Sequence, residues 1–138
     1  MRVLTVCLLG LAAAGCSSQN PYGSSTHAVS GRLVGPAGEV VKGGAEVVLV
    51  PKAVGGGIFG REGSGLVGPD GSFVIKTADG EAIPGGTYQV VVRPYGKATS
   101  EKTAAARAIP KKYWLEDSTD LVVEVTADKA GWELRLAK

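Results

Sequence analysis

Short runs in which hydrophobic and polar residues alternate follow one another from about residue 28 onward. In the run 87–93, Tyr88, Val90 and Val92 fall on one face. Because successive side chains of a strand point to opposite faces, this period of two predicts strands with one buried face. The pattern predicts seven strands, at 28–34, 45–50, 65–67, 73–76, 87–93, 121–126 and 132–136. We expect seven such strands to pack as two antiparallel sheets in an all-β sandwich.

Turn-forming residues separate these runs and limit the helical content. The chain has 21 Gly and 7 Pro among 138 residues, and each interior Gly costs a helix about 1 kcal/mol relative to Ala. Only 99–108 (TSEKTAAARA) combines good helix formers with no Gly, and Ile109-Pro110 ends it. We therefore expect at most one short helix, near 99–108.

The first sixteen residues have the features of an export signal. A positive charge at Arg2 precedes an apolar run over 3–14, which is shorter than the roughly 20 residues that a membrane-spanning helix needs. An Ala-Ala-Gly triplet then precedes Cys16, which resembles a bacterial lipobox, although Ala13 stands where Leu is usual. We expect residues 1–15 to be a signal peptide and Cys16 to be the lipid attachment site. The alternative is an ordinary signal peptide with a chance cysteine near its cleavage site.

Lipidation would anchor the mature protein to a membrane. One myristoyl chain gives only marginal binding, whereas two or three acyl chains hold a protein almost permanently. Ser17 after the cysteine, in place of the Asp that usually retains such proteins, resembles the signal of an outer-membrane lipoprotein facing the periplasm or the surface. Residues 16–27 are polar and predict a flexible tether, so that the domain covers 28–138. With Cys7 removed and Cys16 acylated, no thiol and no disulfide remain.

Charge argues against a nucleic-acid partner. The chain has 15 Lys and Arg against 13 Asp and Glu, and processing removes Arg2. The mature protein is then close to neutral, which is not the strongly basic balance of a nucleic-acid-binding domain. Since 44% of the residues are hydrophobic and 20% are charged, general disorder is excluded as well.

Four motifs occur in an order that resembles a known family. They are VSGRLVGPAGEVVKGGAEVVLVP, GPDGSFVI, IPGGTYQVVV and IPKKYW with the following DSTDLVVEVTADKAGWELRL. Together they resemble carboxypeptidase-regulatory-like, transthyretin-like domains and a group of small bacterial lipoproteins. The resemblance covers 28–138 and implies a seven-stranded Greek-key sandwich with Tyr88 in its core and Gly85-Gly86 in the turn before it. Such domains are mostly non-catalytic.

Residues that could carry catalysis or hold a metal are few. His27 is the only histidine, and GGGIFG matches G-x-G-x-x-G but is followed by REGSG, which cannot begin a phosphate-binding helix. The acidic loops at 79–81 and 116–120 lack the spacing of a calcium site and are interpreted as solvated. A glycosidase pair stays open, with nothing that favours it. We expect no catalytic residue, no cofactor and no metal.

Three aromatic residues in predicted loops are the candidate contacts: Phe59, Tyr95 and Trp114. Exposed aromatic side chains can stack on sugars or anchor a protein partner, but they can also cap the ends of the sandwich. The glycine-rich loop 55–65 is expected to be mobile and is another candidate contact region. The sequence thus predicts a non-enzymatic, lipid-anchored envelope protein that acts as a structural or protein-interaction module. The alternative is a starch-binding-like carbohydrate module, whose partner is a glycan and which requires the three aromatics on one surface.

Overall fold

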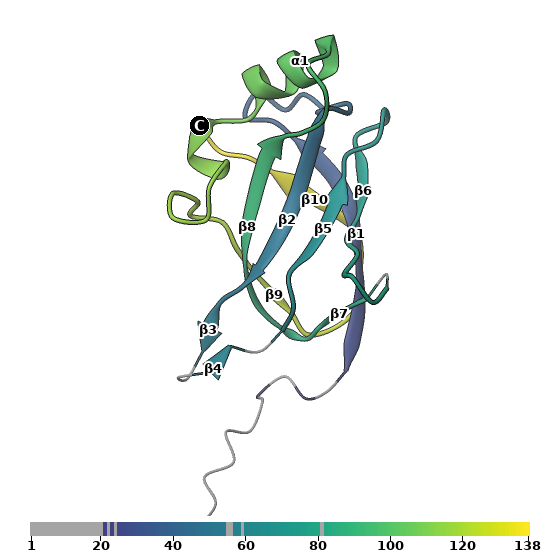
Figure 1. Cartoon of the computed structure of the whole chain (residues 1–138), viewed down its shortest axis with the longest axis vertical. Helices are drawn as coiled ribbons and strands as arrows, with labels where there is room; N and C mark the ends of the chain where they lie inside the picture. The colour runs from purple at the N-terminus through teal and green to yellow at the C-terminus, as the bar shows by residue number, and fades with distance from the viewer. Residues whose placement is uncertain (1–20, 22, 24, 55–56, 59, 81) are drawn as a thin grey trace, which may run out of the picture.

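The computed structural model describes residues 21, 23, 25–54, 57–58, 60–80 and 82–138. Two four-stranded sheets pack against each other, and a helix lies at one end of them (Figure 1). The strands are β1 (Thr26–Val34), β2 (Ala45–Pro51), β3 (Ala53–Val54), β4 (Gly57–Ile58), β5 (Gly63–Leu66), β6 (Ser72–Val74), β7 (Ala82–Pro84), β8 (Gly86–Pro94), β9 (Val122–Val125) and β10 (Lys129–Arg135). The helices are α1 (Ser100–Ala108) and the 3-10 helix η1 (Lys111–Tyr113). The expected all-β sandwich with one short helix is confirmed for the described residues.

The strands and their pairing differ in two ways from the expectation. One sheet has the order β10-β1-β6, with β7 also paired to β1, and the other has the order β5-β2-β8-β9. Every expected strand is present, while β3, β4 and β7 were missed because two or three residues carry no readable alternation. The expectation of purely antiparallel sheets is wrong, because β10 pairs with β1 in parallel. β10 follows β9 of the other sheet, so no hairpin with β1 fixes its direction.

The domain begins slightly earlier than expected. Thr26 and His27 pair with Pro84 and Ile83 of β7, so the first strand takes in two residues that the sequence assigned to the tether. The core residues that the structure describes lie between Val29 and Leu136 and come from both sheets.

Tyr88 is at the centre of this core, as the alternation predicts. Its side chain is fully buried, and its hydroxyl donates a hydrogen bond of 2.6 Å to the carbonyl oxygen of Pro84. Burial raises the pKa of this hydroxyl. The ring also lies directly against Gly60, where a Cβ would be 2.5 Å from the hydroxyl oxygen. A side chain at position 60 would therefore displace the tyrosine.

Part of the glycine-rich stretch has a structural explanation. Gly63 and Gly65 belong to β5 and are buried. A Cβ at Gly65 would come within 2.3 Å of the carbonyl oxygen of Val74, so β5 and β6 can approach this closely only with glycine there. The expectation of a mobile loop is wrong for residues 63–65, and residues 55–56 and 59 lie outside the described residues.

The helix α1 begins and ends where the sequence indicates. The Thr99 hydroxyl accepts a hydrogen bond of 3.3 Å from the backbone N–H of Lys102, as an N-cap does. Ala105 faces the core, and Ile109 ends the helix before Pro110. Figure 1 shows α1 at the end of the sandwich opposite to the start of β1.

We predict that Tyr88→Ala lowers the free energy of unfolding by about 3–5 kcal/mol, because it removes a large buried ring. Tyr88→Phe keeps the ring and loses only the hydrogen bond to Pro84, so a loss of about 1 kcal/mol is expected. Urea denaturation followed by tryptophan fluorescence measures both. A Tyr88→Ala protein as stable as the wild type would contradict the burial of this residue.

Candidate functional site

One face of the second sheet is covered by the segment 111–120 instead of by solvent. Val48 of β2 and Val91 of β8 point away from the core between the sheets, yet they are only 4% and 5% exposed. Two adjoining hollows, of about 530 and 170 Å³, lie where this segment meets the sheet and α1. Both hollows are lined by Arg93, Trp114 and Leu115. We call the two hollows together the Trp114 surface.

The local sequence explains how Trp114 reaches this place. After α1, the 3-10 turn directs Tyr113 inward, where it is 1% exposed. The next residue, Trp114, packs against the edge of the core and remains half-buried. Its indole Nε1 donates a hydrogen bond of 3.1 Å to the carbonyl oxygen of Ile109, which fixes the plane of the ring. Trp114 thus forms a firm wall of the hollow.

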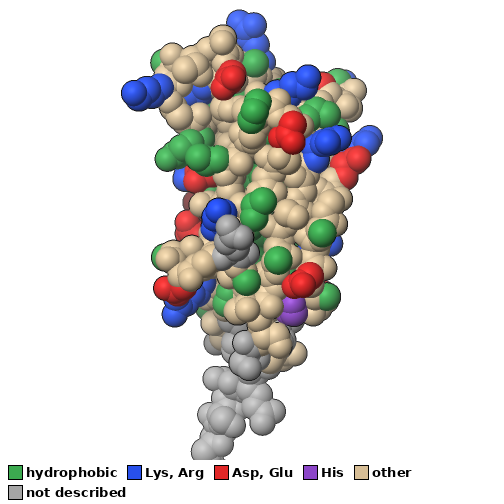
Figure 2. Space-filling model, turned by 90° about the vertical axis from the view of Figure 1, so that its right-hand side faces the viewer, with side chains coloured by type: hydrophobic (Ala, Val, Ile, Leu, Met, Phe, Trp, Pro, Cys, Tyr) green, Lys and Arg blue, Asp and Glu red, His purple; other side chains and the backbone are tan. Residues whose placement is uncertain are grey.

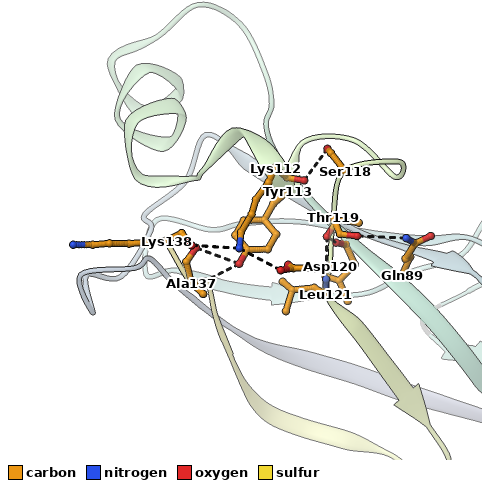
Figure 3. Close-up of polar contacts among 10 residues, drawn as sticks. Gln89, Lys112, Tyr113, Ser118, Thr119, Asp120, Leu121, Ala137 and Lys138 are labelled. Carbon is orange, nitrogen blue, oxygen red and sulfur yellow. Dashed lines mark hydrogen bonds and ion pairs between the residues drawn. The ribbon is translucent and has the colours of Figure 1, made fainter.

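Polar contacts with β8 hold the second half of the segment (Figure 3). Thr119 is buried, and its hydroxyl donates a hydrogen bond of 2.7 Å to the carbonyl oxygen of Val90. The side-chain amide of Gln89 donates to the carbonyl oxygen of Glu116 at 3.1 Å. Two neighbouring residues of one strand therefore tie the segment down at two places.

The first half of the segment is held by the C-terminal residues, which lie beside it in Figure 3. The Tyr113 hydroxyl donates to the carbonyl oxygen of Ala137 and accepts from its N–H, at 3.2 and 3.0 Å. The Lys112 ammonium lies 4.8 Å from the centre of the Tyr113 ring and 3.3 Å from a carboxylate oxygen of Asp120. Both neighbours raise the pKa of the Lys112 ammonium group. The Tyr113 side chain is the larger cause, and the Asp120 carboxylate adds to it.

Leu115 is the exposed member of this fixed segment. Its side chain is 66% exposed, although the residues on both sides of it are held by the contacts described above. Ordering a flexible chain opposes binding, so an apolar side chain that is already held in place loses less entropy when it meets a partner. The geometry suits contact with another molecule.

Charge is distributed unevenly around the surface. The stretch 93–112 has six Lys or Arg residues and one Glu, a net charge of +5, whereas the rest of the chain has nine against twelve, a net charge of −3. Lys102 and Lys111 line the larger hollow, and Glu62 and Glu116 line the smaller one. The Trp114 surface therefore has a cationic end and an anionic end.

An ion pair joins the two sheet strands beneath this surface. Arg93 of β8 donates to a carboxylate oxygen of Glu46 of β2 from both Nε and Nη2, at 3.0 and 2.9 Å. Glu46 is largely buried and Arg93 is about half-exposed. The pair holds the guanidinium between the two hollows, so Arg93 forms part of their common floor.

Of the predicted contact residues, the structure describes Tyr95 and Trp114, which line different hollows. Tyr95 is 48% exposed and lines a separate hollow with Gly44 and Thr99. Phe59 and Cys16 lie outside the described residues. The prediction that the three aromatics share one surface therefore stays a prediction, since Phe59 is not among the described residues.

Sequence reasoning missed Leu115 as a candidate contact. The sequence held one signal: Leu115 is the last of three apolar residues, 113–115, and directly precedes the acidic run 116–120. It was overlooked because no periodic pattern includes it. The sequences of β2 and β8 also do not indicate that a loop covers Val48 and Val91.

Another hollow, of about 840 Å³, is lined by residues of β5 and β6. It is lined mostly by glycine, serine and exposed apolar residues such as Leu66 and Val74. Figure 2 shows the side of the molecule where these strands lie, on which hydrophobic side chains occur singly or in small groups among polar atoms. Within the part of the chain that the structure describes, no three His, Cys, Asp or Glu residues are grouped as metal ligands would be.

Comparison of the chain with protein-family models, with curated proteins and with solved structures found no match.

We predict that Thr119→Val lowers the free energy of unfolding by about 1–3 kcal/mol, because the buried carbonyl of Val90 loses its partner. Ser118→Ala is the matched control. The Ser118 hydroxyl also donates to a backbone oxygen, that of Lys112 at 2.8 Å, but its residue is exposed and water can replace it. Urea denaturation of the two variants should separate them clearly, and an equal effect would contradict the anchoring role of Thr119.

Proposed function

We propose that this protein is a lipid-anchored, non-enzymatic component of the bacterial cell envelope that acts as a structural or protein-interaction module. The order of its motifs and its all-β sandwich support a place among the transthyretin-like, carboxypeptidase-regulatory-like domains. The signal pattern before Cys16 supports a lipid anchor in the outer membrane.

The position of the Trp114 surface relative to the anchor carries the proposal. The start of β1 and α1 lie at opposite ends of the sandwich (Figure 1). β1 has nine residues, which corresponds to a length of about 30 Å. A chain anchored ahead of β1 would therefore present α1 and the neighbouring Trp114 surface away from its membrane. Among the described residues, no helix is sufficiently long and apolar to cross a bilayer.

The groups on this surface suit contact better than chemistry. Its walls are Trp114, Leu115 and aliphatic side chains, and its charged groups are cations at one end and carboxylates at the other. Interfaces between proteins favour such a combination of an apolar centre with a charged rim.

We predict that Cys16→Ala moves the protein from the membrane fraction to the soluble fraction, because the acylated thiol is lost. Fractionation of cells producing the wild type and the variant measures the change, and incorporation of labelled palmitate into the wild type alone identifies the lipid. Ser17→Ala serves as the control and should remain in the membrane. A Cys16→Ala protein that still sediments with membranes would contradict the anchor.

A further inference from the structure

We propose that the Trp114 surface is a self-association surface on which a second copy of this chain docks about a two-fold axis. The axis passes close to Leu115, so that the two Leu115 side chains lie beside each other and each reaches the edge of the larger hollow of the other copy, next to Trp114. This inference rests on the interaction role proposed above, but it does not depend on the lipid anchor.

The apolar part of the surface provides the centre of the contact. Leu115 is 66% exposed and adjoins a hollow of about 530 Å³ that Pro94, Ala106 and Trp114 line. Burying a leucine side chain that was exposed to water is favourable, and the hollow leaves room for one. The same copy carries both the protruding residue and its receptor, which is what a two-fold interface requires.

The charges of the surface are complementary to themselves. Lys102 and Lys111 line the larger hollow, and Glu62 and Glu116 line the smaller one. Arg93 lines both hollows, but its charge is paired with Glu46 of the same copy. Rotation by half a turn about an axis at Leu115 exchanges the two ends. The cationic end of each copy then faces the anionic end of the other, so two sets of opposite charges meet.

An unrelated acidic segment fits this surface less completely. Such a partner would pair with Lys102 and Lys111, but its charge would oppose Glu116 at the other end of the surface. A second copy satisfies both ends at once. Anchoring in one membrane would also raise the local concentration of copies, which favours a weak dimer.

The domain can be tested without its leader. All described core residues lie between Val29 and Leu136, so a chain of residues 17–138 contains the complete core. Sedimentation equilibrium over a range from micromolar to millimolar should show a monomer–dimer equilibrium that weakens with salt.

Leu115→Asp should weaken the dimer by at least about tenfold, because it removes the residue at the centre of the interface. Leu66→Asp is the matched control, since Leu66 is 60% exposed and lies on β5, outside the Trp114 surface. The control should dimerise like the wild type. Circular dichroism checks that each variant is folded, and Leu115→Ser provides a milder change if the aspartate variant does not fold.

Exchange of charges tests the two-fold arrangement itself. Lys111→Glu and Glu116→Lys should each weaken the dimer, because like charges then face each other twice. An equimolar mixture of the two variants should dimerise again, since the heterodimer restores two opposite pairs. The rescue would show that residue 111 of one copy faces residue 116 of another.

A monomer at every concentration would overturn the proposal, as would equal effects of Leu115→Asp and Leu66→Asp, or mixed charge variants that stay monomeric. These results are distinguishable from a failure of the anchor. The full-length Leu115→Asp protein should still sediment with membranes, whereas Cys16→Ala should be released even where the domain dimerises.

Discussion

Strand β8 is the element on which the rest of the structure depends, because it is covered on both faces. Tyr88, Val90 and Val92 pack between the sheets, and Val91 is buried under the segment 111–120. A strand of an antiparallel sheet commonly leaves one face to water. Here the hydrogen bond from Thr119 to the carbonyl of Val90 keeps the outer cover in place. The position of the cover then determines where the Trp114 surface lies.

The sequence predicted the fold well wherever a strand has one buried face and one exposed face. The run 87–93 is an example, and the absence of Gly from 99–108 together with the stop at Ile109-Pro110 located the helix by the same kind of local rule. It could not predict the parallel pairing of β10 with β1, because partner and direction depend on contacts a hundred residues apart along the chain. It also misjudged Gly63 and Gly65. A Cβ at Gly65 would meet the backbone of Val74 in β6, and a Cβ at Gly63 would meet the side chains of Ile75 and Ile83.

The candidate site was predictable only in part. Trp114 was identified from its residue type, but Leu115 became noticeable only because the structure shows an exposed side chain on a fixed segment. The separation of Tyr95 from Trp114 is a property of the tertiary fold and has no local signature. Together, an anchor at one end and an apolar, charge-divided surface near the other end support the account of a module built for contact.

Disulfide trapping in the native membrane tests this account most directly. If Cys7 is removed and Cys16 is acylated, Leu115→Cys introduces the only free thiol of the mature chain. The account predicts that mild oxidation of intact cells yields a covalent dimer through position 115, and little or none through Leu66→Cys. Equal trapping at both positions, or none at position 115 while the thiol is accessible to a soluble reagent, would contradict it.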